Sequence, residues 1–164
     1  MPYAIAFYLK DNTLAKKINM LIGYFDMESD AQQLVLESSL ESIGAVETLI
    51  SKMREKHSIS EESYNGIWIA LNEAVTNAIK HGNKYDPAKK VCLSVETKEN
   101  RYICFTVKDE GAGFDPDSIP DPTKPECLEE PNGRGVFLIN RLADKVNFSG
   151  NGTILEMCFD LFKN

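Results

Sequence analysis

Long apolar runs are absent from this chain of 164 residues, and cationic side chains are outnumbered by anionic ones. No stretch approaches the roughly 20 apolar residues of a membrane-spanning helix, so we expect no membrane segment. Residues 3–9 are apolar but short, and no basic segment or cleavage pattern flanks them, which argues against a signal peptide. The net charge of −7 disfavours direct binding to nucleic acid or to an anionic membrane surface.

Cysteine is present, but it lacks the spacing of a metal site. Cys92, Cys104, Cys127 and Cys158 include no C-x-x-C pair and match no zinc pattern. We therefore expect four reduced thiols in a cytoplasmic protein. The share of apolar residues, 43%, is that of an ordinary globular domain and excludes wholesale disorder.

The chain divides into an N-terminal extension over residues 1–27 and one domain over residues 28–164. The extension is open to three interpretations: a small structural element, a dimer contact, or residues translated from an early start codon. Within the domain, residues 114–131 hold five of the seven prolines, and six acidic residues beside one lysine. A loop of this length and composition is typical of a lid, a binding loop or a disordered link.

Hydrophobic periodicity predicts the remaining elements. The expected strands and helices are a strand at 34–36, helices over 40–57 and 60–81, strands near 91–95 and 103–107, a helix from 135, and strands at 146–148 and 153–162. Ser60 is expected to cap the second helix, and Gly82 to end it as a C′ glycine. Clustered hairpins predict the α+β class, a two-layer α/β sandwich whose mixed, mostly antiparallel sheet carries helices on one face.

Three clusters of polar residues stand out, and the first is on the second long helix. Glu73, Asn77 and His81 are spaced four apart along one edge of its apolar arc, beside the small residues Gly66 and Ala70. A carboxylate can act as a general base, and a carboxamide oxygen suits Mg²⁺. A solvated helix edge that ends in a histidine near the helix dipole explains the same pattern equally well.

The second cluster is Asp109-Glu-Gly111-Ala-Gly113. Asp109 shares strand parity with Phe105 and Val107, so it is expected on the helix side of the sheet, where an acid needs a partner. Its carboxylate could accept a hydrogen bond from an exocyclic amine such as that of adenine. The alternative is an ordinary turn at the end of a strand.

The third cluster, Gly133-Arg134-Gly135, opens the helix that follows the proline-rich loop. Glycines before a helix N-terminus expose amides that can bind phosphate, and Arg134 could add a positive charge. No Gly-Lys-Ser/Thr follows, so this is not a Walker A loop. A flexible loop exit is the competing interpretation.

Taken in order, these motifs resemble those of the GHKL ATPase superfamily. The segment 73–82 (E-x-x-x-N-A-x-x-H-G) is similar to its N-box, and the segments 109–114 and 132–135 are similar to its first and second glycine boxes. Within that superfamily the chain most resembles the anti-sigma-factor serine/threonine kinases of bacterial partner switching. The resemblance implies a Bergerat-type ATP-binding fold, ATP and Mg²⁺ as cofactors, and residues 114–131 as the ATP lid.

The resemblance also implies roles for single residues and for partners. Glu73 would be the catalytic base, Asn77 the Mg²⁺ ligand and Asp109 the reader of adenine, with His81 a neighbour of the site. The implied nucleotide-binding set is Asn77, His81, Asp109, Gly111, Gly113, Gly133, Arg134 and Gly135. The implied partners are an anti-anti-sigma antagonist, phosphorylated on serine or threonine, and a sigma factor; a homodimer is common among such kinases.

One departure leaves a second function open. Kinases of this type carry an arginine shortly before the second glycine box, where this chain has Pro131, while Arg134 lies inside the box. A non-catalytic, nucleotide-gated partner-binding module is therefore the alternative. The catalytic half of a histidine kinase is disfavoured, because no long phospho-acceptor helix pair precedes the domain and His57 is expected to be a helix-end residue.

Overall fold

The computed structural model describes residues 32–115 and 134–163. In chain order its elements are β1 (Gln32–Glu37), the 3₁₀ turn η1 (Leu40–Ser42), α2 (Ile43–His57), α3 (Glu61–Asn77), η2 (Ala78–Gly82), β2 (Lys90–Lys98), β3 (Tyr102–Lys108), α4 (Arg134–Leu142), β4 (Lys145–Ser149) and β5 (Ile154–Asp160). The extension over 1–27, most of the expected lid, Pro131 and Gly133 lie outside the described residues. The division of the chain at residue 28 therefore stays a prediction.

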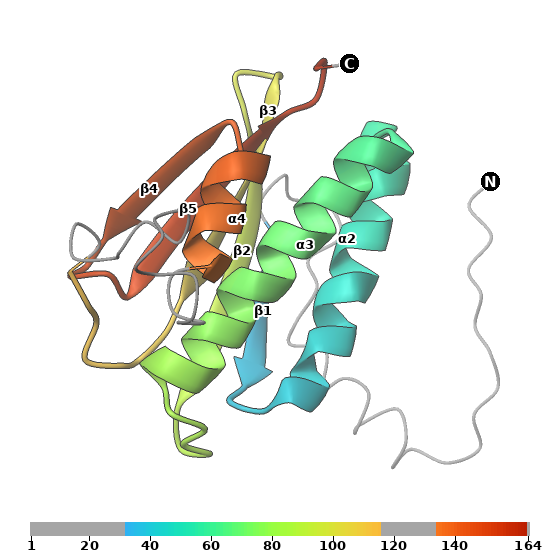
Figure 1. Ribbon diagram of the computed structural model, residues 1–164. Coiled ribbons are helices and arrows are strands. Elements are labelled where there is room, and N and C mark those ends of the chain that lie inside the picture. The colour runs from blue at the N-terminus through green and yellow to red at the C-terminus, as the bar shows by residue number, and fades with distance from the viewer. Residues whose placement is uncertain (1–31, 116–133, 164) are drawn as a thin grey trace, which may run out of the picture.

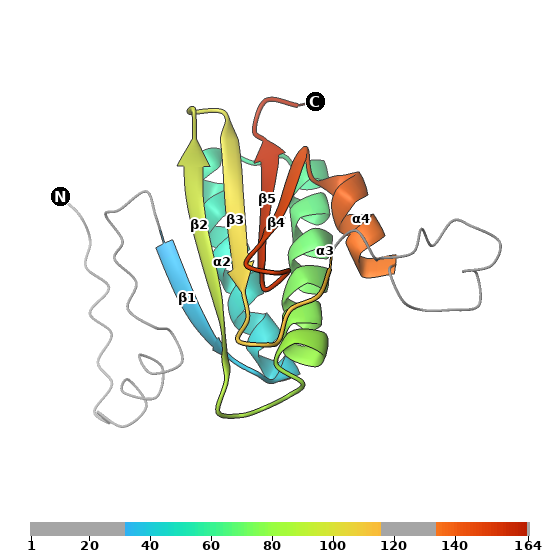
Figure 2. The same cartoon turned by 90° about the vertical axis from the view of Figure 1, so that its left-hand side faces the viewer.

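The five strands form one sheet in the spatial order β1-β2-β3-β5-β4. Helices α2, α3 and α4 lie against the same face of this sheet, as Figures 1 and 2 show from two directions. The two-layer α+β sandwich expected from the sequence is confirmed, and each strand pair in the described ranges is antiparallel. None of the helices in the part of the chain that the structure describes is long and apolar enough to cross a bilayer.

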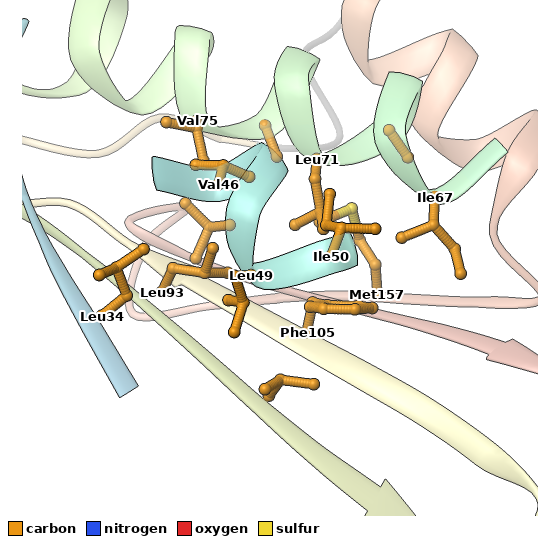
Figure 3. Packing of buried hydrophobic residues seen from close by; sticks show 14 of the residues in the cluster. Leu34, Val46, Leu49, Ile50, Ile67, Leu71, Val75, Leu93, Phe105 and Met157 are labelled. Atoms are coloured by element: carbon orange, nitrogen blue, oxygen red, sulfur yellow. The ribbon is translucent and has the colours of Figure 1, made fainter. Parts of the chain in front are cut away.

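One apolar cluster fills the space between the helices and the sheet (Figure 3). Strand residues enter it at every second position, because successive side chains of a strand face opposite sides of the sheet. Its members labelled in Figure 3 are Leu34, Leu93, Phe105 and Met157 from the strands, with Val46, Leu49, Ile50, Ile67, Leu71 and Val75 from the helices. Each fully buried side chain of this kind stabilises the fold by about 1.5–3 kcal/mol, so the cluster fixes α3 firmly on the sheet.

Helix α3 begins as the sequence predicts but ends differently. The Ser60 side chain caps it, with the backbone N–H of Ser63 donating to Ser60 Oγ at 3.1 Å. After α3 the chain widens into the π-helical turn η2, and the first left-handed residues that follow are Lys84 (φ 55°) and Tyr85 (φ 59°). The expectation that Gly82 acts as a C′ glycine is therefore wrong. Glycine is needed there because another part of the chain approaches it closely.

Two of the cysteines form a disulfide, so the expectation of four reduced thiols is wrong. Cys104 on β3 and Cys158 on β5 stand opposite each other in the antiparallel register, with Cα atoms 4.0 Å apart. They are separated by 54 residues in the sequence, and only the pairing of β3 with β5 brings them together. Cys92 carries a free thiol.

Candidate active site

A cavity of about 370 Å³ lies between α3, the first turn of α4 and the adjoining ends of β3 and β5. Its wall includes most of the residues that the motifs singled out, namely Glu73, Asn77, His81, Asp109, Gly113, Arg134 and Gly135. Val107, Ile139 and Leu155 add apolar surface. An apolar cavity of this size with a few convergent polar groups is typical of small-molecule sites. Three motifs that are remote in the sequence thus meet at one place.

The carboxylate–carboxamide pair of α3 lies directly under the first turn of α4. Glu73 and Asn77 are one helical turn apart, both half-buried, and α4 runs alongside α3 (Figure 1). A Cβ atom at Gly135 would lie 2.6 Å from Glu73 Oε2 and 3.0 Å from Asn77 Nδ2. Glycine at this position therefore permits the second glycine box to touch both polar side chains of the N-box.

Asp109 follows β3 and is held at the cavity by hydrogen bonds from the backbone. Its own N–H donates to the carbonyl of Thr153 at 3.0 Å, and the N–H of Gly111 donates to Asp109 Oδ1 at 2.7 Å. Burial raises the pKa of this carboxyl above its ordinary value, although the Gly111 bond and the nearby charge of Lys89 act in the opposite direction. A half-buried carboxylate at the cavity wall is suited to accepting a hydrogen bond from a donor on a ligand.

The end of the N-box and the first glycine box interlock through two glycines. A Cβ at Gly82 would lie 2.4 Å from Asp109 Cγ, and a Cβ at Gly111 would lie 2.3 Å from the carbonyl oxygen of Gly82. Gly111 is thus a packing residue beside the cavity, not a part of its wall. These contacts explain why the motifs need glycine at both places.

Two further candidates lie at the cavity edge. His81 is exposed and belongs to the wall, which fits the role of a neighbour of the site. Arg134 is the first residue of α4 and also belongs to the wall. Because the N-terminus of a helix carries partial positive charge, this end of the cavity favours an anionic group.

The tip of the hairpin between β4 and β5 is a part of the site that the sequence does not reveal. The N–H of Phe114 donates to the carbonyl of Asn151 at 2.8 Å, and the ring of Phe114 meets that of Phe148 edge to face at 5.6 Å. Gly152 has φ +82°, and a Cβ there would lie 2.3 Å from the Phe114 carbonyl oxygen. The Gly-Asn-Gly motif predicts a turn, but only the pairing of β3 with β5 places that turn against Phe114.

This geometry defines a class of protein: a two-layer α/β sandwich with an N-box helix, a strand-ending aspartate and a glycine-opened helix around one cavity. A family model described as "Histidine kinase-like ATPase domain" matches residues 36–159. The chain belongs to this family, the GHKL ATPases, within their group of anti-sigma serine/threonine kinases. The resemblance drawn from the three motifs is therefore confirmed.

Several relatives are similar over most of the chain. Serine-protein kinase RsbW of Oceanobacillus iheyensis is 26% identical over 134 residues, covering 78% of this chain and 84% of the relative. The RsbW of Halalkalibacterium halodurans is 30% identical over 132 residues, with coverages of 76% and 80%. Anti-sigma F factor of Bacillus subtilis is 35% identical over 101 residues, with coverages of 57% and 67%. These likenesses support ATP binding and serine/threonine kinase activity, as the sequence predicts.

Proposed function

We propose that this protein transfers the γ-phosphoryl group of ATP to a serine or threonine of an anti-anti-sigma antagonist, and that it binds a sigma factor. The observation that carries the catalytic part is the close approach of Gly135 to both Glu73 and Asn77, where a Cβ atom would find no room. A base and an oxygen ligand stand side by side where a helix N-terminus faces the cavity. Phosphoryl transfer depends on such positioning and on charge stabilisation.

In the proposed reaction Glu73 accepts the proton of the substrate hydroxyl. The hydroxyl oxygen forms a bond to the γ-phosphorus while the bond from that phosphorus to the β–γ bridging oxygen breaks, so that ADP leaves. Glu73 is half-buried and lines the cavity, which leaves its carboxylate accessible to a hydroxyl presented from outside. General-base catalysis requires this access first and a suitable pKa second.

The residues present also fit a magnesium ion bound together with the nucleotide. Asn77 offers a neutral carboxamide oxygen at the cavity wall. Within residues 32–115 and 134–163 no group of three His, Cys, Asp or Glu side chains could hold a metal ion. The carboxamide oxygen of Asn77 suits Mg²⁺, because this ion is usually bound through few protein ligands together with substrate phosphates and water. When bound, Mg²⁺ would neutralise charge on the phosphates.

Nucleotide recognition is assigned to the other walls. We infer that Asp109 accepts a hydrogen bond from the exocyclic amine of adenine, and that the first turn of α4 with Arg134 faces the phosphates. The half-buried carboxylate of Asp109 and the positive end of α4 support these roles. Gly133, which the sequence places beside phosphate, lies outside the described residues.

The partners follow from the relatives. Anti-sigma F factor of B. subtilis is named for the sigma factor that it opposes, and RsbW is named a serine-protein kinase. By analogy this chain would work in the cytoplasm, where sigma factors act. A homodimer stays a prediction, which sedimentation equilibrium would check.

The non-catalytic alternative rests on Pro131, which lies outside the described residues. The similarity to serine-protein kinases favours the kinase. The hypothesis that the chain is the catalytic half of a histidine kinase gains no support, because His57 is the last residue of α2 and is not among the residues that line the cavity.

Substitution Glu73→Gln tests the proposal. The variant keeps the size and hydrogen-bonding reach of the side chain but removes the base, so it should bind ATP normally and transfer about 100-fold less γ-labelled phosphate or worse. Glu62→Gln, at the exposed start of the same helix, is the matched control and should transfer normally. If Glu73→Gln transfers phosphate to the purified antagonist at the wild-type rate, the catalytic role of Glu73 is refuted. If the wild-type protein binds ATP but transfers no phosphate, the nucleotide-gated module is the function instead.

A further inference from the structure

A buried asparagine links the end of the N-box helix to the first glycine box. Asn83 directly follows η2 and is 1% exposed, one of two buried polar residues in the described part of the chain. No motif of the sequence includes it. A carboxamide at such depth must find partners for all of its polar atoms, since an unsatisfied buried group is costly.

The partners of Asn83 come from three different segments. Its Nδ2 donates to Ser38 Oγ at 2.8 Å and to the carbonyl oxygen of Lys90 at 2.9 Å. Its Oδ1 accepts the backbone N–H of Glu110 at 2.8 Å. The Ser38 hydroxyl oxygen and the Lys90 carbonyl oxygen need a donor, and the Glu110 N–H needs an acceptor, so only one orientation of the Asn83 carboxamide satisfies all three.

The bond to Glu110 matters because this residue stands between Asp109 and Gly111. Three successive backbone N–H groups are each held by one acceptor: Asp109 by the Thr153 carbonyl, Glu110 by Asn83 Oδ1, and Gly111 by Asp109 Oδ1. The central bond is supplied by Asn83. A shift of the Glu110 peptide would move the Asp109 backbone on one side and the Gly111 N–H on the other.

A second bond closes a ring around the same place. The backbone N–H of Lys90 donates to Glu110 Oε2 at 2.6 Å, while its carbonyl accepts from Asn83. The start of β2 therefore fixes both the side chain of Glu110 and the carboxamide of Asn83. At the far end Ser38 Oγ donates to the Lys89 carbonyl at 2.8 Å, which ties the network to the residue after β1.

We propose that Asn83 is a positioning residue for purine recognition: it holds the Glu110 peptide so that the Asp109 carboxylate meets the exocyclic amine of the base. The inference rests on the proposed role of Asp109. Asn83 does not belong to the cavity wall, and it acts through Asp109.

The test compares two ligands on two variants by calorimetric titration. ADP carries the 6-amino group, and purine riboside 5′-diphosphate lacks it. Wild type should prefer ADP by about 10- to 100-fold, the range for a hydrogen bond to a charged group. Asn83→Ala should lose about tenfold in ADP affinity, while its affinity for the deamino analogue stays within twofold of the wild-type value. The reason is that the substitution and the missing 6-amino group disrupt the same hydrogen bond, so their effects do not add.

Ser38→Ala is the matched control, because it removes a buried partner of Asn83 but leaves the bond to Glu110. Its melting temperature should fall while its preference for ADP stays at the wild-type value. Equal weakening of both ligands by Asn83→Ala would overturn the proposal, since a merely structural residue acts in that way. Absence of ADP binding in the wild type would instead refute the proposed function, and this inference with it.

If Asn83→Ala does not fold, amide hydrogen exchange on the wild-type protein tests the positioning role of Asn83. ADP should slow exchange of the Glu110 and Gly111 amides together, because they belong to one held unit. Slowing at Gly111 without slowing at Glu110 would overturn the proposal.

Discussion

Substitution of Gly135 by alanine should separate folding from catalysis. The new Cβ would lie 2.6 Å from Glu73 Oε2, whereas ordinary contact begins near 3.4 Å. The carboxylate oxygen must therefore move by about 0.8 Å, which is feasible because it is the end of a flexible side chain. A misplacement of about 1 Å can cost about 100-fold in rate, equivalent to about 2.7 kcal/mol.

The fold should tolerate this change well. Alanine is favoured over glycine in helices by about 1 kcal/mol, and Gly135 is the second residue of α4. We expect Gly135→Ala to unfold within a few degrees of the wild type, to bind ATP with modest loss, and to transfer phosphate to the antagonist about 100-fold more slowly.

Gly44→Ala is the matched control for helix propensity. A Cβ at Gly44 in α2 would meet nothing within 4 Å, so this variant should gain up to about 1 kcal/mol in stability at unchanged activity. Thermal unfolding and single-turnover transfer measure the two effects separately. Full transfer activity in Gly135→Ala would refute the reasoning that this glycine sets the position of Glu73.

Two further predictions concern Asp109 and the disulfide. Burial raises the pKa of Asp109, so this carboxyl stabilises the fold most at acidic pH and loses that contribution as the pH rises through its folded pKa. The variant Asp109→Asn should therefore have a higher melting temperature than wild type at pH 7 and the same melting temperature below pH 3.8. It should also no longer prefer ADP to the deamino analogue. An equal melting temperature at pH 7 would contradict the burial cost. The disulfide should appear in non-reducing peptide maps as a linked pair containing Cys104 and Cys158, and Cys104→Ser should lower the free energy of unfolding by up to about 4 kcal/mol, the entropy of a loop of 54 residues. Alkylation of both thiols without reductant would exclude the bond.

The parts of the fold that could be predicted from the sequence depend on local patterns. Apolar spacing located α2 and α3, and alternation located β2 and β3, because helix and strand periods are properties of short segments. Spacing within α3 also places Glu73 and Asn77 on one edge, and strand parity places Asp109 towards the helices. The structure brings these three to one cavity.

The rest depends on contacts between distant segments. The pairing of β3 with β5, which joins segments far apart in the sequence, sets Cys104 against Cys158 and the Gly152 turn against Phe114. Gly82 reads as a helix end, but its role is the close approach of Asp109. Asn83 belongs to none of the three motifs, and the hydrogen bonds that hold it in the interior join it to Ser38, Lys90 and Glu110.

Titration of ATP with and without Mg²⁺ tests the central claim most directly, that the cavity between α3 and α4 holds a magnesium nucleotide through Asn77. Wild type should bind ATP more tightly with Mg²⁺, and Asn77→Ala should lose most of that gain. Asn147→Ala, at an exposed position of β4, should behave as wild type. Full magnesium-dependent binding by Asn77→Ala, or no ATP binding by the wild type, would contradict the account.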